Sequence, residues 1–435
     1  MPTRKLFRIE SAFRKGCERT LRVANAMHIH SAKLLASILF AYILVLVCNV
    51  SPSFAQRAVV PGKGTPQFQS AVIPFSFEDN RIFVRTIING QGPFSFVVDT
   101  GSGDLTVDSA VARRLRLRTK PAGSTGGAGS RAVTFSTGVV ASIQVGAARA
   151  DNQPATVLDL SQIRDGIGLP RLDGIIGYSM LKHYAVEVDS SRHVLTLSRE
   201  HINPPGTARA VPFTIDSGFI FVSGRIQGDS GTILIDTGDR SSLTIFSPFA
   251  VKHQIYGRFG GVQNVLTGFG VGGPVYGDVF RLPQFDVLGA QLRNITTRAS
   301  RQKGGVFASN VAAGSIGGGL LSRFNIVYDY PRSTIYVWRN SLFTVPDSYD
   351  RAGLWLSMHD DHAYIASVVP NGPASRAGLR QGDKIVTVDG RPIGAQDLLA
   401  LRNLFSSSPP GTAIRIVRES HGKKSSHEVV LKQLV

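Results

Sequence analysis

Short runs of apolar residues, separated by polar and glycine-rich turns, recur along most of the chain. Runs such as 81–88 and 219–226 are rich in β-branched and aromatic residues, which is typical of strands. Residues 109–115 are predicted to form one short helix instead of a strand. Asp108, which stands just before them, is the predicted N-cap. The strands that the pattern predicts are 81–88, 94–99, 185–189, 194–197, 219–226 and 232–236.

This pattern of strands occurs twice. The tripeptide Asp-Thr-Gly (D-T-G) ends a strand in each copy, and its two aspartates, Asp99 and Asp236, are 137 positions apart. Blocks before and after the tripeptides match in the same order at offsets of 138 and 140 positions, which indicates an internal duplication. Each copy spans about 130 residues, an ordinary domain size. The matching blocks are 73–92 with 211–230, and 174–197 with 314–337.

Glycine-rich segments occupy similar places in the two copies, at 122–130 and 267–277. A flexible loop is one interpretation of each segment. A mobile hairpin that covers a cleft is the other. The positions of the hairpin tips do not follow from the pattern.

The composition agrees with a β-rich fold, because 46 of the 435 residues are glycine and only 18% are charged. The formal net charge is +18, of which residues 1–33 contribute +6. The other basic residues are scattered, without aromatic interleaving and without a zinc-finger or RNA-binding motif. We therefore expect a basic soluble surface and no nucleic-acid partner. Peripheral association with anionic lipid or envelope polymers stays open.

The N-terminal region predicts export. An uncharged apolar run at 34–50 follows a basic stretch and precedes small residues, which indicates a signal peptide over 1–55 that is cleaved after Ala55. A start at Met27 would give a signal peptide of more ordinary length. The alternative is an uncleaved anchor in the inner membrane that faces the periplasm, because such a run is near the short limit of a spanning helix. We expect a periplasmic or extracellular protein.

The two cysteines, Cys17 and Cys48, both precede the predicted cleavage site. The mature protein would therefore have no disulfide, no thiol nucleophile and no cysteine-ligated metal. His183, His253 and His362 are isolated in the sequence, as surface or core histidines usually are. We expect neither a metal nor a cofactor, so the chemistry has to come from carboxylates, hydroxyls or histidines.

The two D-T-G turns, with the apolar-apolar-glycine elements at 175–177 and 315–317, resemble the pepsin and retropepsin superfamily of aspartic proteases. The resemblance covers about residues 71–340. It implies a mainly β, bilobal fold in which two duplicated lobes each supply one D-T-G turn. In this family the apolar-glycine strand passes under the turn and holds it. The corresponding lobes are 71–200 and 208–340.

The resemblance assigns catalysis to a dyad of Asp99 and Asp236. Hydrolysis of an amide needs a base that activates water and an acid that protonates the carbonyl oxygen and then the leaving nitrogen. Two neighbouring carboxylates cannot both ionise easily, so they share one proton. By resemblance, the threonines bond across a pseudo-twofold axis, the glycines allow close approach of the backbone, and the serine orients Asp99. These supporting residues are Thr100, Gly101, Ser102, Thr237 and Gly238.

Asp239 departs from the family pattern, which has serine, threonine or alanine at this position. The carboxylate of Asp239 could point away from the dyad, with Ser241 or Ser242 supplying the outer hydrogen bond. It could also raise the local proton affinity, or mark a second copy that has drifted away from catalysis.

A different pattern begins near residue 350, and residues 363–393 closely resemble a bacterial PDZ domain that would span 350–435. The segment 352–357 corresponds to the carboxylate-binding loop, whose backbone N–H groups form a nest for a peptide C-terminus. The segment 397–405 corresponds to the helix that walls the peptide groove, although its leucines are also compatible with a purely core position. The candidate peptide-binding residues are Gly353, Leu354, Trp355, Leu356, Leu398 and Leu401.

We therefore expect an exported aspartic endopeptidase that cleaves extended polypeptides by general acid–base catalysis at a site formed within one chain. The PDZ domain would bind the C-termini of substrates or partners. Two other function classes stay open. The protein could be a catalytically inactive peptide-binding scaffold of the cell envelope. It could also dock on anionic envelope surfaces through its positive charge, in which case salt would abolish its main activity.

Overall fold

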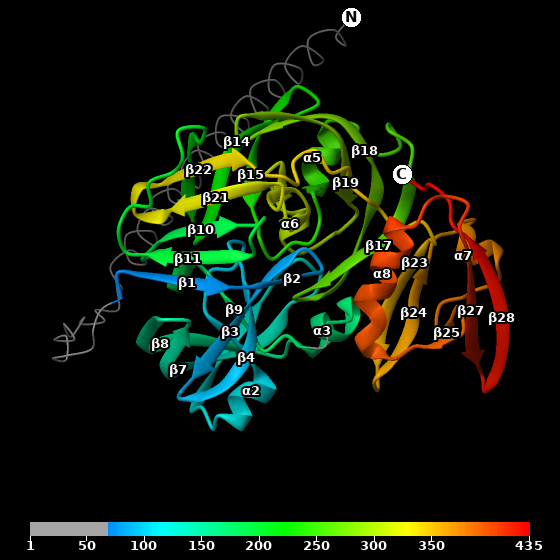
Figure 1. The fold of residues 1–435 in the computed structure, drawn as a ribbon, viewed down its shortest axis with the longest axis horizontal. Helices are drawn as coiled ribbons and strands as arrows, with labels where there is room; N and C mark the ends of the chain where they lie inside the picture. Colours follow the sequence, from blue (N-terminus) through cyan, green and yellow to red (C-terminus); the bar gives the residue numbers. More distant parts are fainter. Residues whose placement is uncertain (1–67, 170) are drawn as a thin grey trace, which may run out of the picture. The chain divides into compact units, whose positions relative to one another are not determined.

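The computed structural model describes residues 68–169 and 171–435. The predicted signal peptide, 1–55, lies outside the described residues. Strands predominate over helices in the described part (Figure 1), as the pattern of apolar runs predicts. In this part of the chain, no helix combines the length and the apolar character that crossing a membrane requires.

Two eight-stranded sheets share one topology. The first, here called the first repeat, contains β2 (Ser76–Glu78), β3 (Arg81–Ile88), β4 (Gln91–Val98), β5 (Thr106–Asp108), β6 (Thr119–Thr125), β7 (Val133–Val145), β8 (Ala148–Leu158) and β9 (Gly174–Ile176). The second repeat contains β13 (Thr214–Asp216), β14 (Phe219–Ile226), β15 (Asp229–Ile235), β16 (Leu243–Ile245), β17 (Val262–Gly270), β18 (Gly273–Val287), β19 (Ala290–Ser300) and β20 (Gly314–Ile316).

The strand orders of the two repeats correspond position by position. The first is β2-β3-β4-β9-β5-β8-β7-β6 and the second is β13-β14-β15-β20-β16-β19-β18-β17. The additional pairing of β3 with β7 has its counterpart in β14 with β18. This correspondence confirms the internal duplication that the sequence blocks indicate.

A third sheet takes strands from both halves of the chain. Its order is β1-β11-β10-β21-β22-β12, and the antiparallel pairing of β10 with β21 connects the two halves. The predicted hairpin of 185–189 and 194–197 is confirmed as β10 and β11. One apolar core runs through both repeats and this sheet. The strands are β1 (Ser70–Pro74), β10 (Ala185–Asp189), β11 (Val194–Ser198), β12 (Arg209–Pro212), β21 (Phe324–Asp329) and β22 (Thr334–Arg339).

The apolar-glycine strands β9 and β20 hold the D-T-G turns. β9 pairs in parallel with β4, and beyond the strand the N–H of Asp99 donates to the carbonyl of Ile176 at 3.0 Å. A Cβ atom on Gly177 would lie 2.5 Å from the carbonyl oxygen of Ser102, so only glycine fits under the turn. In the second repeat, Asp236 and β20 repeat this arrangement.

Helices are few and short in the described residues. The predicted helix at 109–115 is confirmed as α2 (Ser109–Arg114), and Oδ1 of Asp108 caps it by accepting the N–H groups of Ala110 and Val111. The other helices and 3-10 turns of the two repeats are α3 (Ser161–Ile167), α4 (Tyr178–Leu181), α5 (Ser247–Lys252), η1 (Val306–Ala308), α6 (Gly318–Leu321) and η2 (Tyr330–Arg332).

The C-terminal domain, orange and red in Figure 1, has its own sheet and its own apolar core. The sheet order is β23-β24-β25-β27-β28, with β26 paired to β25, so β23 is an edge strand. The elements are β23 (Leu354–His359), β24 (His362–Val368), α7 (Pro373–Arg376), β25 (Lys384–Val388), β26 (Arg391–Pro392), η3 (Ala395–Asp397), α8 (Leu398–Ser407), β27 (Ala413–Ser420) and β28 (Lys423–Val430).

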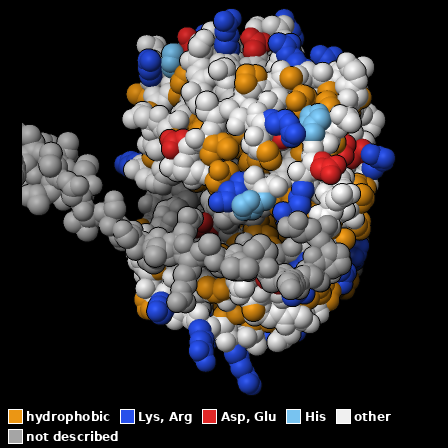
Figure 2. All heavy atoms as spheres, turned by 90° about the vertical axis from the view of Figure 1, so that its left-hand side faces the viewer, with side chains coloured by type: hydrophobic (Ala, Val, Ile, Leu, Met, Phe, Trp, Pro, Cys, Tyr) orange, Lys and Arg blue, Asp and Glu red, His pale blue; other side chains and the backbone are white. Residues whose placement is uncertain are grey.

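On the face drawn in Figure 2, lysine and arginine side chains are spread among apolar and uncharged ones and do not form one large patch. This distribution agrees with the basic but unspecialised surface that the scattered sequence charges predict.

Candidate active site

The two D-T-G turns lie opposite each other. Asp99 follows β4, Asp236 follows β15, and both are half-buried. A Cβ atom added to Gly101 would lie 2.5 Å from Cγ of Asp236, and Gly238 packs as closely against the carboxylate of Asp99. The two carboxylates, here called the dyad, are close enough that each affects the pKa of the other.

Backbone N–H groups hold one oxygen of each carboxylate. The N–H of Gly101 donates to Oδ1 of Asp99 at 2.7 Å. The N–H groups of Gly238 and Asp239 donate to Oδ1 of Asp236 at 3.0 Å and 2.9 Å. The second carboxylate therefore receives its outer hydrogen bond from the backbone of its own turn.

The serine hydroxyls near the dyad do not take the roles expected of them. Oγ of Ser102 donates to the carbonyl of Asp104 at 3.3 Å, because the turn offers this acceptor two residues further on. The structure therefore does not bring the Ser102 hydroxyl to Asp99. The hydroxyls of Ser241 and Ser242 likewise bond to side chains outside the dyad, so neither supplies the outer hydrogen bond.

Two buried threonines join the turns across the repeats. The N–H of Thr100 donates to Oγ1 of Thr237 at 3.0 Å, and the N–H of Thr237 donates to Oγ1 of Thr100 at 3.1 Å. Each hydroxyl then donates to a carbonyl of the other repeat, Thr100 to Ile235 at 2.8 Å and Thr237 to Val98 at 2.7 Å. Because these bonds are reciprocal, they fix the position of one aspartate relative to the other.

Burial and mutual repulsion shift the proton affinities of the dyad. Burial raises the pKa of Asp236 well above its usual range, and the charges of Asp99 and Asp239 raise it further. Burial also raises the pKa of Asp99, but the hydrogen bond from the N–H of Gly101 opposes this rise. The two carboxylates therefore titrate as a pair that binds one proton more readily than an isolated, solvated carboxylate does. A protonated and an ionised carboxyl group can therefore lie side by side here.

The third carboxylate, Asp239, is buried in an ion pair. Its Oδ2 accepts hydrogen bonds from Nη2 of Arg298 and Oγ1 of Thr244, each at 2.9 Å, and its Oδ1 accepts the N–H of Ser241 at 3.0 Å. Burial acts to raise the pKa of Asp239, but the Arg298 guanidinium and these donors hold it below its usual value. Asp239 is therefore an ionised group that faces Arg298 and adds to the proton affinity of Asp236.

Sequence reasoning misses two buried arginines that support the second turn. Arg81 of β3 donates from Nε to the carbonyl of Gly238 at 2.7 Å. Arg298 of β19 donates to Asp239 and, from Nε at 2.7 Å, to Oγ1 of Thr244. Arg81 stands inside the predicted strand 81–88, where an arginine is rarely buried unless it is paired, whereas Arg298 of β19 lies outside the predicted strands. This placement is the signal that could have identified Arg81, and no such signal marks Arg298.

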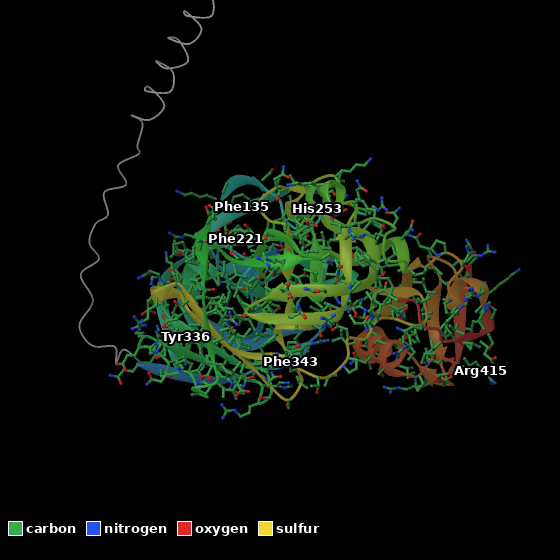
Figure 3. The ribbon with its side chains drawn as sticks, turned by 90° about the horizontal axis from the view of Figure 1, so that it is seen from above. Phe135, Phe221, His253, Tyr336, Phe343 and Arg415 are labelled. Carbon is green, nitrogen blue, oxygen red and sulfur yellow. The ribbon has the colours of Figure 1, made fainter. Side chains whose placement is uncertain are left out.

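A cavity of about 550 Å³ lies over the dyad. Both aspartates line it, and apolar side chains of both repeats contribute its walls, among them Phe135 of β7 (Figure 3). Such a surface, which combines apolar walls with polar and charged groups, suits an extended peptide. The apolar wall residues are Phe135, Leu158, Ile163, Phe219, Phe269 and Phe307.

The glycine-rich segments form two hairpin tips that meet over this cavity. Gly129, in the tip between β6 and β7, donates from its N–H to the carbonyl of Val271 at 2.9 Å. Arg131 donates from its N–H to the carbonyl of Gly272 at 3.1 Å, and both acceptors belong to the tip between β17 and β18. A Cβ atom on Gly127 would lie 2.6 Å from Cβ of Val271, so this contact requires a small residue. The cavity is thus covered from both repeats.

The predicted peptide-binding residues lie on or beside β23 and α8. The N–H groups of Gly353 and Leu354 donate to Oδ1 of Asp350, the second at 3.1 Å. Nε1 of Trp355 donates to the carbonyl of Gly166 in the first repeat at 2.8 Å. The four predicted leucines belong to the apolar core of the domain, although Leu354 also lines a cavity beside α8 and Leu398 packs against Gly168 of the first repeat. The side chains in the apolar core are Leu354, Leu356, Leu398 and Leu401.

Two segments of the chain match known families. Residues 84–180, which include Asp99, match the aspartyl protease family, and residues 364–419 match the PDZ domain. The first repeat therefore carries an aspartyl protease segment, and the C-terminal domain is a PDZ domain, as the sequence resemblances imply.

Curated relatives match over short stretches. A probable periplasmic serine endoprotease DegP-like of Chlamydia trachomatis serovar D is 42% identical over 74 residues, 17% of this chain and 14% of that protein. The protein of the same name from Chlamydia muridarum is 46% identical over 59 residues, 13% and 12% of the two chains. The magnetosome formation protease MamE of Magnetospirillum gryphiswaldense is 42% identical over 53 residues, 12% and 7%. The chain thus spans at most 14% of the length of these relatives.

Two plant seed globulins are similar among solved structures. Basic 7S globulin from soybean is 13% identical with a TM-score of 0.39, and the match covers 63% of this chain and 96% of that chain. Conglutin gamma from lupine seeds is 14% identical with the same TM-score and the same coverage.

Proposed function

We propose that the chain is an aspartic endopeptidase with a pepsin- and retropepsin-like bilobal fold, and that it hydrolyses peptide bonds in extended polypeptides. The observation that carries this proposal is the dyad, in which Asp99 and Asp236 come from equivalent turns of two repeats and lie against each other. The aspartyl protease match over 84–180 supports the role of the first turn. The domains are then lobe 1 at 71–200, lobe 2 at 208–340 and the PDZ domain at 350–435.

In this proposal, Asp99 is the base and Asp236 is the acid. The ionised Asp99 accepts a proton from water while the water oxygen bonds to the carbonyl carbon, and Asp236 gives its proton to the carbonyl oxygen. Asp99 then passes its proton to the leaving nitrogen, and the C–N bond breaks. The hydroxyl that was the carbonyl oxygen returns its proton to Asp236. Each carboxyl group ends in its starting protonation state, so the next turnover can begin.

The ion pair of Asp239 with Arg298 supports this assignment of acid and base. The ionised Asp239 raises the pKa of Asp236 and so favours the proton on that carboxyl group. The N–H of Asp239 also holds Oδ1 of Asp236 at 2.9 Å. The unusual fourth residue of the second turn is therefore compatible with catalysis, and it does not favour an inactive scaffold.

The names of the curated relatives introduce a serine-type mechanism as the competing chemistry. Within the described ranges, the serine–histidine hydrogen bonds are those of Ser420 with His421 and Ser425 with His427, both in the PDZ domain. The other ring nitrogen of His427 contacts the carbonyl of Ala377 at 2.7 Å and not a carboxylate. A serine nucleophile needs a histidine that a carboxylate orients, so the dyad is the better supported site.

We further propose that the protein works in the periplasm or outside the cell on polypeptide substrates. Two relatives carry the word periplasmic in their names. The PDZ domain would bind peptide C-termini, because PDZ domains bind extended peptides by strand addition. Both members of the dyad come from one chain, so a monomer would be sufficient for catalysis.

The mechanism predicts a bell-shaped pH dependence of kcat/KM for cleavage of an unstructured peptide library. At low pH both members of the dyad are protonated and the base is lost, whereas at high pH both are ionised and the acid is lost. Because burial and the charges of Asp99 and Asp239 raise the pKa of Asp236, the alkaline limb lies above the ordinary carboxyl pKa of about 4. Initial rates of the full chain across the acidic, neutral and mildly alkaline range measure this profile.

Far-UV circular dichroism at each pH is the control that the chain stays folded. A rate that rises once near pH 7 and then stays constant would indicate a histidine base and contradict the dyad. The proposal would be equally wrong if the folded chain cleaved no peptide at any pH.

A further inference from the structure

The PDZ domain has a groove between the edge strand β23 and the helix α8, here called the PDZ groove. An extended peptide adds to such an edge as a further strand. Beside α8 the groove opens into a cavity of about 540 Å³ that the PDZ domain and both repeats line. The α8 side chains that line this cavity recur every three or four positions, so they lie on one face of the helix. They are Leu399, Arg402, Asn403 and Ser406.

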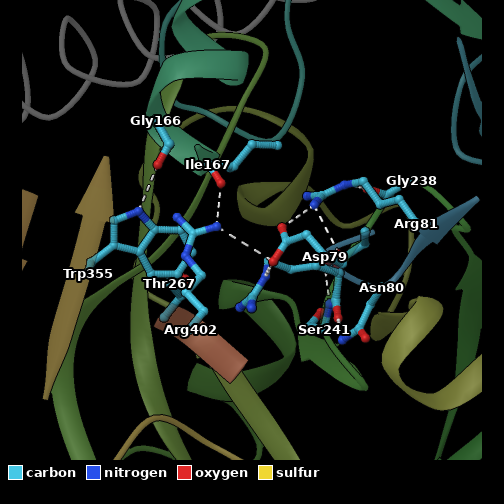
Figure 4. Close-up of polar contacts among 12 residues, drawn as sticks. Asp79, Asn80, Arg81, Gly166, Ile167, Gly238, Ser241, Thr267, Trp355 and Arg402 are labelled. Atoms are coloured by element: carbon cyan, nitrogen blue, oxygen red, sulfur yellow. Dashed lines mark hydrogen bonds and ion pairs between the residues drawn. The ribbon is translucent and has the colours of Figure 1, made fainter. Parts of the chain in front are cut away.

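The first repeat fills part of the PDZ groove with residues 166–168, at the end of α3; Figure 4 shows Gly166 and Ile167 of this segment. Nε1 of Trp355 donates to the carbonyl of Gly166 at 2.8 Å. Gly168 has a φ of 63°, and a Cβ atom added there would collide with the side chain of Leu398. An apolar cluster continues across this contact. Its members include Leu160, Ile167, Leu169, Leu172, Trp355 and Leu399.

Arg402 of α8 spans the PDZ groove. Its guanidinium donates to the carbonyl of Leu356 on β23 at 2.7 Å and also to the carbonyl of Ile167 (Figure 4 shows the second contact). The ring of Trp355 lies 4.7 Å from Cζ of Arg402 and covers the charge. A peptide that adds to β23 as a further strand needs the free carbonyls of this edge strand as hydrogen-bond acceptors. The carbonyl of Leu356 already accepts from Arg402.

The site at which the C-terminal carboxylate of a peptide would bind is also occupied, by the side chain of Asp350. The successive N–H groups of Gly353 and Leu354 form a nest of the kind that binds anions, and Oδ1 of Asp350 accepts both. Burial raises the pKa of Asp350 to about 6, although these N–H groups and the Arg402 charge favour its ionised form.

Arg402 also reaches the support of the second D-T-G turn (Figure 4). Its Nη1 lies 3.6 Å from Oδ1 of Asp79, and Nε of Arg240 donates to the same oxygen at 2.8 Å. The other oxygen of Asp79 binds Arg81, whose Nε holds the carbonyl of Gly238. One buried carboxylate therefore connects the PDZ helix to the turn that carries the proposed acid.

We propose that the PDZ groove is an internal docking surface for residues 166–168, and that a polypeptide with a free C-terminal carboxylate binds there only by displacing this segment and Asp350. The partner is an extended chain whose last side chain is apolar, because Leu354, Trp355 and Leu399 line the cavity beside the nest. The apparent affinity for the partner is lowered in proportion to the fraction of molecules in which the groove is open.

Displacement of residues 166–168 also affects the proposed active site. This second part of the proposal rests on the proposed hydrolytic function. A peptide that takes the Leu356 carbonyl separates Arg402 from its partners, so Asp79 loses one of its three arginines. The second turn then loses part of its support, and a bound peptide lowers the rate of hydrolysis. By thermodynamic linkage, the conformation in which Arg402 supports the second turn also binds the peptide more weakly.

Binding is measured in the Asp99→Asn background, so that its outcome does not depend on hydrolysis. The probes are a library of fluorescent decapeptides with free C-termini, and the same sequences with amidated C-termini are controls. Gly168→Ala places a Cβ atom against Leu398 and opens the PDZ groove. Gly90→Ala is the matched control, because its φ of 73° carries the same strain with nothing within 4 Å. Asp350→Ala is the second opening variant, since it frees two N–H groups.

We expect Gly168→Ala and Asp350→Ala to bind free-carboxylate peptides at least about tenfold more tightly than the parent, and Gly90→Ala to bind like the parent. Amidated peptides should not bind. Equal affinities of the parent and both opening variants would overturn the proposal. Binding of amidated peptides with the same affinity, or no binding to any variant, would overturn it too.

The effect on hydrolysis is measured with the dyad intact. The tightest free-carboxylate peptide is added at a saturating concentration to a reaction with a second, internal substrate, and its amidated form is added in parallel. We expect the free-carboxylate form alone to lower the rate. An unchanged rate with the groove occupied would overturn the connection through Asp79.

Discussion

Replacing either Asp99 or Asp236 with asparagine lowers kcat/KM for peptide hydrolysis by about 10²- to 10⁴-fold, the usual contribution of a general acid or base. Asparagine keeps the shape of the side chain but cannot exchange a proton at working pH. Asp99→Asn removes the group that activates water, and Asp236→Asn removes the proton that the carbonyl oxygen receives. The measurement is kcat/KM of each variant on one fluorogenic peptide at the pH optimum of the parent.

Two controls separate this loss from damage to the fold. The amide oxygen of asparagine can still accept the N–H groups of Gly101 and Gly238, so the free energy of unfolding should stay near that of the parent. Because the two carboxylates act as one unit, the double variant should be no slower than the slower single variant. Parent-like activity of Asp236→Asn would show that hydrolysis does not need the second repeat.

Arg298→Met lowers the free energy of unfolding by about 3–5 kcal/mol at neutral pH, which is typical when one partner of a buried ion pair is removed. The substitution leaves Asp239 buried without the guanidinium that lies 2.9 Å away in the parent. Without Arg298, burial raises the pKa of Asp239 above its value in the unfolded chain, so folding then takes up a proton.

This proton uptake gives the loss a defined pH dependence. A raised pKa in the folded state makes the variant lose stability as pH rises above the unfolded carboxyl pKa of about 4. In the parent, where the pKa of Asp239 is lowered, the ion pair instead contributes stability that is lost as pH falls below that value. The difference between the variant and the parent should therefore be large at pH 7 and smaller at pH 4. Urea unfolding at both values measures it.

Arg149→Met is the matched control for Arg298→Met. Arg149 and Asp151 also form an ion pair at 2.9 Å, but their side chains are 48% and 47% exposed, so we expect a loss below about 1 kcal/mol. Adding Asp239→Ala to Arg298→Met should recover part of the stability, because it removes the unpaired charge. Similar losses for Arg298→Met and Arg149→Met would show that the buried pair does not stabilise the second turn.

The duplication and the place of both D-T-G turns could be predicted from the sequence, because each is a local pattern that recurs in order. An apolar run that ends in Asp-Thr-Gly predicts a strand followed by a turn wherever it stands, as at Asp99 and Asp236. Likewise, an aspartate just before a short helical pattern predicts a cap, and Asp108 caps α2. The matching strand orders of the repeats follow from this repetition.

The supports of the second turn could not be predicted in the same way. Arg81 and Gly238 are 157 residues apart, and Arg298 and Asp239 are 59 residues apart. Which side chains meet at such separations depends on the folded path of the chain and not on a local pattern. The same holds for residues 166–168, which contact the PDZ groove from another domain.

The direction in which a side chain points also could not be predicted from the local sequence pattern. Ser102 has the residue type that the family pattern implies, but its hydroxyl finds a nearer acceptor in its own turn. In α8, the helical spacing of Leu398 and Leu401 is compatible with a groove or a core, and both side chains are in the core. Leu399, which lies between these two leucines, and Arg402, which follows Leu401, face the cavity instead.

The most direct test of the central claim compares two inhibitors of hydrolysis by the full chain. One is a peptide in which a secondary alcohol replaces the scissile carbonyl, so that it mimics the tetrahedral intermediate that the dyad would bind. The other is a fluorophosphonate, which labels an activated serine. We predict that one peptide alcohol per chain abolishes hydrolysis and that the fluorophosphonate leaves the rate unchanged. Complete inhibition by the fluorophosphonate, with no effect of the peptide alcohol, would contradict the account.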